Sequence, residues 1–177
     1  MALTKIESNG LLLSDNFDFT GNVTGAGETN EPSFYGRLAS DQSVSRATTT
    51  KITGMTGNEV DTATAFDGTT FTVPSGKGGK YYIEAVVTGD YSNAGQDGEE
   101  TVAMIYKNGS AIKLATYREN SSVTGNTRVC TTVATAIVDL SATDTIEMFA
   151  HIQDASGSGN HVVKGELTSL QGFRIAS

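Results

Sequence analysis

The sequence predicts an all-β sandwich or barrel, and three observations support this class. Short runs of alternating apolar and polar residues recur from residue 32 onward, with Gly, Pro and Asn between them. No window carries the sustained 3.6-residue periodicity of a helix. Glycine occurs 20 times among 177 residues, which suits tight turns between short strands.

The first 31 residues differ from the rest and are expected to form an extended N-terminal arm before a head at 32–177. The segment is too broken for a helix and too short for a core of its own. It is either a leader without fixed structure or an arm that becomes ordered only against a partner. In the second interpretation its anchoring residues are Leu11, Leu13, Phe17 and Phe19.

From residue 32 the expected strands follow one another with short connections. They are 33–38, 48–55, 70–73, 81–88, 101–106, 111–117, 127–140, 145–152 and 170–176. Asn108 and Gly109 predict a type I′ hairpin turn, because both residues tolerate the positive φ angles that this turn requires.

The strand expected at 81–88 carries large or apolar side chains on both faces. One face holds Tyr81, Ile83, Ala85 and Val87, and the other holds Tyr82, Glu84, Val86 and Thr88. Such a strand lies between two partners rather than between a core and water. The second partner is either another sheet or another subunit.

Five motifs, in this order, resemble those of the complement C1q globular head. They are F-D at 66–67 with F-T-V-P at 71–74, G-K-Y-Y-I at 79–83, K-N-G at 107–109, L-S-A-T-D-T-I at 140–146, and S-L-Q-G-F-R-I at 169–175. Ile83 replaces the usual aromatic residue and Thr143 the usual glycine. The resemblance implies a ten-stranded jelly roll of the C1q and tumour-necrosis-factor superfamily, whose members associate as trimers.

The strand expected at 127–140 fits a trimer. Its face from Cys130 to Leu140, in steps of two, is small and apolar enough for the space between sheets. Its other face, from Val129 to Ile137, is too apolar to leave in water. The predicted trimer interface comprises Tyr82, Glu84, Val86, Val129, Val133, Ile137 and Phe149.

Composition argues against several classes of function. The net charge of -8, without a basic run, disfavours nucleic acids and anionic membranes as partners. No stretch is long enough to span a bilayer, and no secretory signal is recognised, so membrane insertion is not expected. The one cysteine, Cys130, excludes an intramolecular disulfide and a cysteine-based zinc cluster.

No catalytic, cofactor-binding or metal-binding residue is predicted. The loop at 90–100 gathers four carboxylates, which suits calcium, but it lacks the EF-hand spacing, and calcium binding stays open. His151 and His161 have no identifiable third ligand. No nucleophile is placed beside a base, and an enzyme is therefore not expected.

The function predicted is that of a structural and adhesive bacteriophage virion protein, assembled in the bacterial cytoplasm and displayed on the virion surface. A homotrimeric knob would be held to other virion proteins of the capsid or tail by its arm. The loops at 89–100, 118–127 and 153–164 would face a glycan or protein of the host surface. The alternative is a bacterial ligand-binding module, lectin-like, either soluble or in a surface layer.

Overall fold

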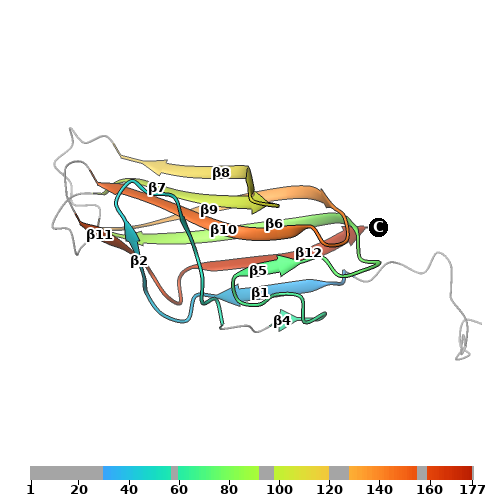
Figure 1. Cartoon of the computed structure of the whole chain (residues 1–177). Helices are drawn as coiled ribbons and strands as arrows, with labels where there is room; N and C mark the ends of the chain where they lie inside the picture. Colours follow the sequence, from blue (N-terminus) through green and yellow to red (C-terminus); the bar gives the residue numbers. More distant parts are fainter. Residues whose placement is uncertain (1–29, 57–59, 92–97, 120–127, 155–158, 177) are drawn as a thin grey trace, which may run out of the picture.

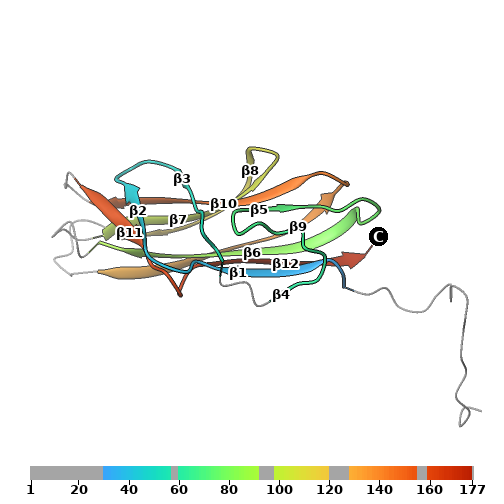
Figure 2. The same ribbon diagram turned by 60° about the horizontal axis from the view of Figure 1, so that its bottom comes forward.

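The computed structural model describes residues 30–56, 60–91, 98–119, 128–154 and 159–176, and this part of the chain forms twelve strands and no helix. The strands are β1 (Ser33–Arg37), β2 (Gln42–Ser45), β3 (Thr50–Lys51), β4 (Val60–Asp61), β5 (Thr70–Thr72), β6 (Gly79–Asp90), β7 (Gly98–Lys107), β8 (Ser110–Arg118), β9 (Val129–Leu140), β10 (Thr145–Asp154), β11 (Asn160–Val163) and β12 (Ser169–Ala176). They form two sheets packed face to face (Figures 1 and 2). The predicted all-β class is confirmed.

The seven-stranded sheet is organised around β6. Along one edge, β6 pairs with β9 from Gly79 to Asp90, which is its full length. Along the other edge it pairs first with β12 and then with β11. Beyond these, β1 and β4 extend the sheet from β12, and β2 extends it from β11.

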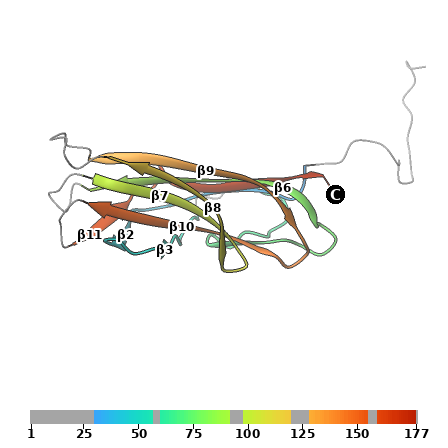
Figure 3. The ribbon, with the colours of Figure 1, turned by 90° about the horizontal axis from the view of Figure 1, so that it is seen from above.

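The five-stranded sheet is organised around β10 in the same way. One edge of β10 pairs with β7, and β8 continues the sheet beyond β7. The other edge pairs with the short strands β5 and β3. Strands β8 and β9 are the last of their sheets on the same side of the sandwich, where they contact each other (Figure 3).

The core between the sheets comes from the inward half of each alternating pattern. On β6 the side chains of Tyr81, Ile83, Ala85 and Val87 are fully buried, as their spacing predicts. At the end nearer residue 30, Phe34 stacks on Phe71 with ring centroids 4.3 Å apart, and Phe71 contacts Tyr81 at 5.9 Å. Phe71 and Tyr81, which come from two of the sequence motifs, therefore meet with Phe34 in one cluster of the core.

The hairpin predicted at Asn108 and Gly109 is confirmed. Both residues have positive φ angles, 50° and 77°, and they join β7 to β8. The Asn108 side chain also ties this turn to the neighbouring one, because its Nδ2 donates to Asp144 Oδ1 at 2.7 Å. This bond, with Lys107 and the Ser141 amide, lowers the pKa of Asp144 to about 2.

Three strands were not predicted, namely β2, β4 and β11. Each is two to four residues long and places at most two residues in the core. In addition, the run expected at 48–55 pairs only at Thr50–Lys51. These short strands depend on distant partners, since β2 pairs with β11 and β4 with β1.

The two ends of the sandwich differ (Figure 1). Both ends of the described chain lie at one of them, where Ser33 pairs with Phe173 and Ala176 pairs with Lys80. We call this the terminal end. The strands that flank residues 92–97, 120–127 and 155–158 finish at the opposite end, which we call the loop end.

Replacing Gly172 by alanine is expected to destabilise the head. A Cβ at Gly172 would lie 2.6 Å from Ile83 Cδ1 and 2.8 Å from the Tyr82 carbonyl oxygen, because β12 passes close to β6 and Phe34. Overpacking of this kind costs about 1–3 kcal/mol of unfolding free energy, measurable by urea denaturation. Gly159→Ala, where a Cβ meets nothing within 4 Å, is the matched control and should change little. Equal effects of the two variants would contradict the packing described.

Candidate interaction surfaces

The solvent-side face of the seven-stranded sheet, here called the outer face, carries apolar side chains that remain exposed. On β9, residues at every second position point outward, and Val129, Val133 and Ile137 are 49%, 47% and 69% exposed. All three lie on β9, and the only described pairing of β9 is with β6. A row of exposed aliphatic side chains along an edge strand is typical of a surface that another chain covers.

The apolar character continues across the sheet through the strand register. Ile137 lies opposite Tyr82 of β6, and Tyr82 lies opposite Phe173 of β12. The rings of Tyr82 and Phe173 are in contact, with centroids 5.4 Å apart. Val86 is the next outward residue of β6 after Glu84 toward the loop end, and it lies opposite Val133 of β9. The outer face is therefore a continuous surface and not a set of isolated residues.

Glu84 lies in the middle of this face, and its carboxylate is already hydrogen-bonded there. Tyr82 Oη donates to Oε2 at 2.8 Å, and Gln171 Nε2 donates to Oε1 at 2.5 Å. The bond to Glu84 raises the pKa of the Tyr82 hydroxyl, which keeps its proton as a donor. Because its two oxygens have partners within the sheet, Glu84 can be covered without being left unsatisfied.

Six of the seven residues predicted for the interface lie together on the outer face, and Phe149 does not. Phe149 is on β10, in the other sheet, and its ring stacks on Tyr106 with centroids 4.0 Å apart. The expectation that it shares a face with β9 is wrong, because outward residues of the two sheets point to opposite sides of the sandwich. Contact of the other six with a second copy remains a prediction.

The structure adds residues to the outer face that the sequence did not indicate. Tyr35 of β1, Val60 of β4 and Phe173 of β12 surround a hollow of about 210 Å³, and Gly172 contributes to its lining without a side chain. The available signal was the alternation within β1 and β12, in which Tyr35 and Phe173 occupy the outward positions. Val60 gave no signal, because its strand has two residues.

A polar cluster, buried except for part of Arg46, lies at the loop end. The Arg46 guanidinium donates through Nε to Asp154 Oδ1 and through Nη2 to the Asp154 carbonyl oxygen at 2.7 Å. His161 Nε2 lies 3.7 Å from Asp154 Oδ2, and both side chains are fully buried. The edge of the Tyr91 ring contacts His161, with centroids 5.4 Å apart. The cluster joins β10 and β11 to the residue that follows β2.

Burial lowers the pKa of His161, against the opposing attraction of Asp154, and the Arg46 charge lowers it further. Neither ring nitrogen has a hydrogen-bond partner among the described residues. His161 is therefore a neutral, buried histidine that packs against Tyr91. It lies between the sheets, whereas His151 is on the solvent side of β10, so the two do not meet as metal ligands.

Cys130 is placed as a structural residue beside this cluster. Its thiol is buried and donates to Thr101 Oγ1 at 2.9 Å, while the Tyr91 hydroxyl bonds the same threonine. Burial raises the pKa of the thiol, which disfavours the reactive thiolate. Burial likewise raises the pKa of Tyr91. This arrangement gives Cys130 no base to activate it.

The predicted contact loops fall partly outside the described residues, as does the whole of the arm anchor at Leu11, Leu13, Phe17 and Phe19. Within the described ranges, no group of three or more His, Cys, Asp or Glu residues is arranged to hold a metal ion. The carboxylate of Glu99 accepts from Gln153 at 3.0 Å, and that of Glu100 pairs with Arg118 at 2.9 Å. Calcium binding at 90–100 thus stays untested.

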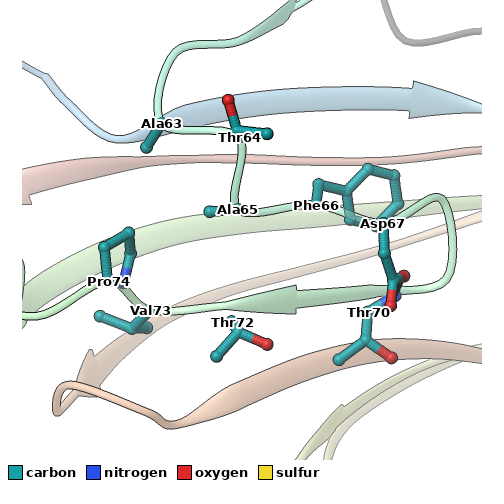
Figure 4. Close-up of a pocket in the computed structure, with 9 residues that line it drawn as sticks. All are labelled: Ala63, Thr64, Ala65, Phe66, Asp67, Thr70, Thr72, Val73 and Pro74. Carbon is teal, nitrogen blue, oxygen red and sulfur yellow. Dashed lines mark hydrogen bonds between the residues drawn. The ribbon is translucent and has the colours of Figure 1, made fainter.

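A hollow of about 480 Å³ lies beside β5 and is lined by residues between Ala63 and Pro74 (Figure 4). Its lining is mainly threonine and alanine. Its one charged side chain, Asp67, uses Oδ1 to accept from the amides of Thr69 and Thr70 at 2.8 and 2.7 Å. This carboxylate is part of the turn, and the hollow offers no group placed for chemistry.

In the part of the chain that the structure describes, no helix is long and apolar enough to cross a membrane.

Successive strands alternate between the two sheets for much of the chain, which defines the fold as a jelly-roll sandwich. Solved structures specify its type. The globular domain of zebrafish complement 1qA protein is 12% identical, with a TM-score of 0.53 over 82% of this chain and 98% of that one. Murine APRIL is 10% identical, with a TM-score of 0.55 over 81% and 98%. The Eiger TNF of S. frugiperda is 11% identical, with a TM-score of 0.54 over 82% and 91%.

The chain therefore has the jelly-roll fold of the C1q and tumour-necrosis-factor proteins, as the sequence motifs predicted. At these identities the likeness concerns the fold alone. No protein-family model and no curated protein matches the chain.

His161 should make the stability of the head fall as the solution becomes acidic. Its pKa in the folded state lies below the ordinary value of 6.5, so the unfolded chain takes up the proton first as the pH decreases. Its contribution is complete above pH 6.5 and is lost as the pH falls from there toward the folded pKa. Thermal unfolding between pH 7 and 5 measures this slope. His161→Leu should flatten this slope, and an unchanged slope in His161→Leu would contradict the assignment.

Proposed function

We propose that this chain is the non-enzymatic, homotrimeric head of a bacteriophage virion protein, held to the particle through residues 1–31 and presenting its loop end to the host. The observation that carries the proposal is the apolar outer face. Val129, Val133 and Ile137 stay about half exposed or more in a single copy. Association that removes them from water is favoured by the hydrophobic effect.

Obligate homo-oligomer interfaces are more apolar than ordinary surfaces and bury on the order of 2,000 Å² or more. The outer face suits such an interface, because aromatic and aliphatic side chains run across it from β9 to β1 and its central carboxylate, Glu84, is satisfied internally. Membership of a fold whose known members are trimers supports the number three. The proposed interface is accordingly this face.

The difference between the two ends of the head supports an anchored role. The arm sequence precedes β1 at the terminal end, and the strands that flank residues 92–97, 120–127 and 155–158 finish at the opposite end (Figure 1). A head attached at the terminal end presents the loop end outward. The apolar residues of the arm, Leu11, Leu13, Phe17 and Phe19, are the groups proposed to bind other virion proteins.

A non-enzymatic role is supported by the side chains that the structure places. Among the described residues, Cys130 is buried without a base, His161 is buried and neutral, and Asp67 is part of a turn. The second candidate is a bacterial lectin-like module, soluble or in a surface layer. It uses the same fold and the same loops, but it has no place on a virus particle.

The solution mass of the full chain should be that of three copies. Burial of the outer face provides the driving force, and light scattering coupled to size exclusion measures the mass directly. The value should not change on dilution across the micromolar range, because obligate interfaces of this size hold below it. A mass of one copy would contradict the homotrimer and leave the outer face without an explanation.

Antibody raised against the head should label intact virus particles made from the genome that encodes this chain. Gold particles seen by electron microscopy on the capsid or on the tail would also place the protein there. Purified particles should contain the chain by mass spectrometry after extensive washing. Unlabelled particles in lysates that contain the soluble protein would contradict the virion role and favour the lectin-like module.

A further inference from the structure

Ile137 is the most exposed of the outward-facing aliphatic side chains on β9. It is 69% exposed and lies near the terminal end of the strand, directly opposite Tyr82 of β6. On its other side β9 has no further described strand. Its side chain therefore stands on the outer face at the margin of the described sheet, accessible to another chain.

The hollow on the outer face lies toward the opposite margin of the same sheet. Its lining includes Tyr35, Val60, Tyr82, Gln171 and Phe173, and its volume is about 210 Å³. An apolar cavity of about 150 Å³ suffices to bind benzene, so an isoleucine side chain fits. The aromatic lining offers the contacts that such a side chain gains by burial.

Ile137 and the hollow lie at the same level along the strands. The register places Ile137 opposite Tyr82, and Tyr82 opposite Phe173, which is part of the lining. A rotation axis parallel to the strands therefore brings this side chain of one copy to the hollow of another without a rise along the axis. Contacts without a rise close into a ring, whereas contacts with one continue as a filament.

We infer that Ile137 of one copy packs into the aromatic hollow of the next copy. The inference rests on the proposed function, in that the partner on the outer face is a second copy of this chain. The Ile137 side chain of the same copy does not fill the hollow, since it is not part of the lining and stays 69% exposed. Each copy contributes one Ile137 and one hollow, so a closed ring leaves neither unfilled.

The contact is tested with the full chain and three variants: Ile137→Ala, Tyr35→Ala and the double variant. Sedimentation velocity over a concentration series measures the midpoint of dissociation, which is the protein concentration at which half of the oligomer has dissociated. Each single variant should raise this midpoint about tenfold or more, as truncation of a central interface residue does. Ile137 is exposed in a single copy, so unchanged circular dichroism should show that the fold persists.

The double variant separates a direct contact from two independent effects. If Ile137 packs against Tyr35 of the next copy, the double variant is much less weakened than the product of the single effects, because one contact is lost only once. The matched control is Leu114→Ala, which removes an aliphatic side chain, 53% exposed, from the other sheet. It should leave the midpoint unchanged.

The outcomes distinguish this inference from the proposed function. A wild-type chain of single-copy mass overturns the homotrimer and the contact together. A wild-type oligomer that Ile137→Ala does not weaken overturns the contact alone. Single effects that multiply in the double variant do the same, and so does equal weakening by Leu114→Ala.

Discussion

Strand β6 is hydrogen-bonded along both edges and carries large side chains on both faces, and the rest of the head is arranged around this constraint. Its inner side chains, including Tyr81 and Ile83, build the core with the five-stranded sheet. Its outer side chains, Tyr82 and Val86, continue into the exposed residues of β9. Because β6 carries large or apolar side chains on both faces, the core within one copy covers only one of these faces.

The polar groups near β6 have different kinds of partner at its two faces. On the outer face, the carboxylate of Glu84 accepts hydrogen bonds from Tyr82 and Gln171. Between the sheets at the loop end, the charge of Asp154 is balanced by Arg46, while His161 stays neutral beside them. The first arrangement satisfies a carboxylate on a surface that another chain can cover, and the second joins β10 and β11 to Arg46 at the loop end.

Alternation in the sequence was sufficient to predict the inward and outward residues of the long strands β6 and β9. It was not sufficient to place Phe149, because a two-residue period defines the faces of a strand but not the sheet to which the strand belongs. The strands β2, β4 and β11 exist through pairing with distant segments, and their buried residues, Val44, His161 and Val163, are too few to mark them. Alternation within β1 and β12 marked Tyr35 and Phe173 as outward, but it could not show that they line one hollow, since this lining comes from β1, β4, β6 and β12.

The alignment of the strands with the line between the two ends has a mechanical consequence. A pull that enters at residue 30, against a load at the loop end, acts along β1, whose residues from Ser33 to Arg37 pair with β12. The hydrogen bonds of an antiparallel ladder are perpendicular to the strands, so this pull shears all of them at once. Shearing a ladder requires its bonds to break together, whereas peeling breaks them one by one. A head joined at the terminal end is thus oriented to bear tension in its stronger direction.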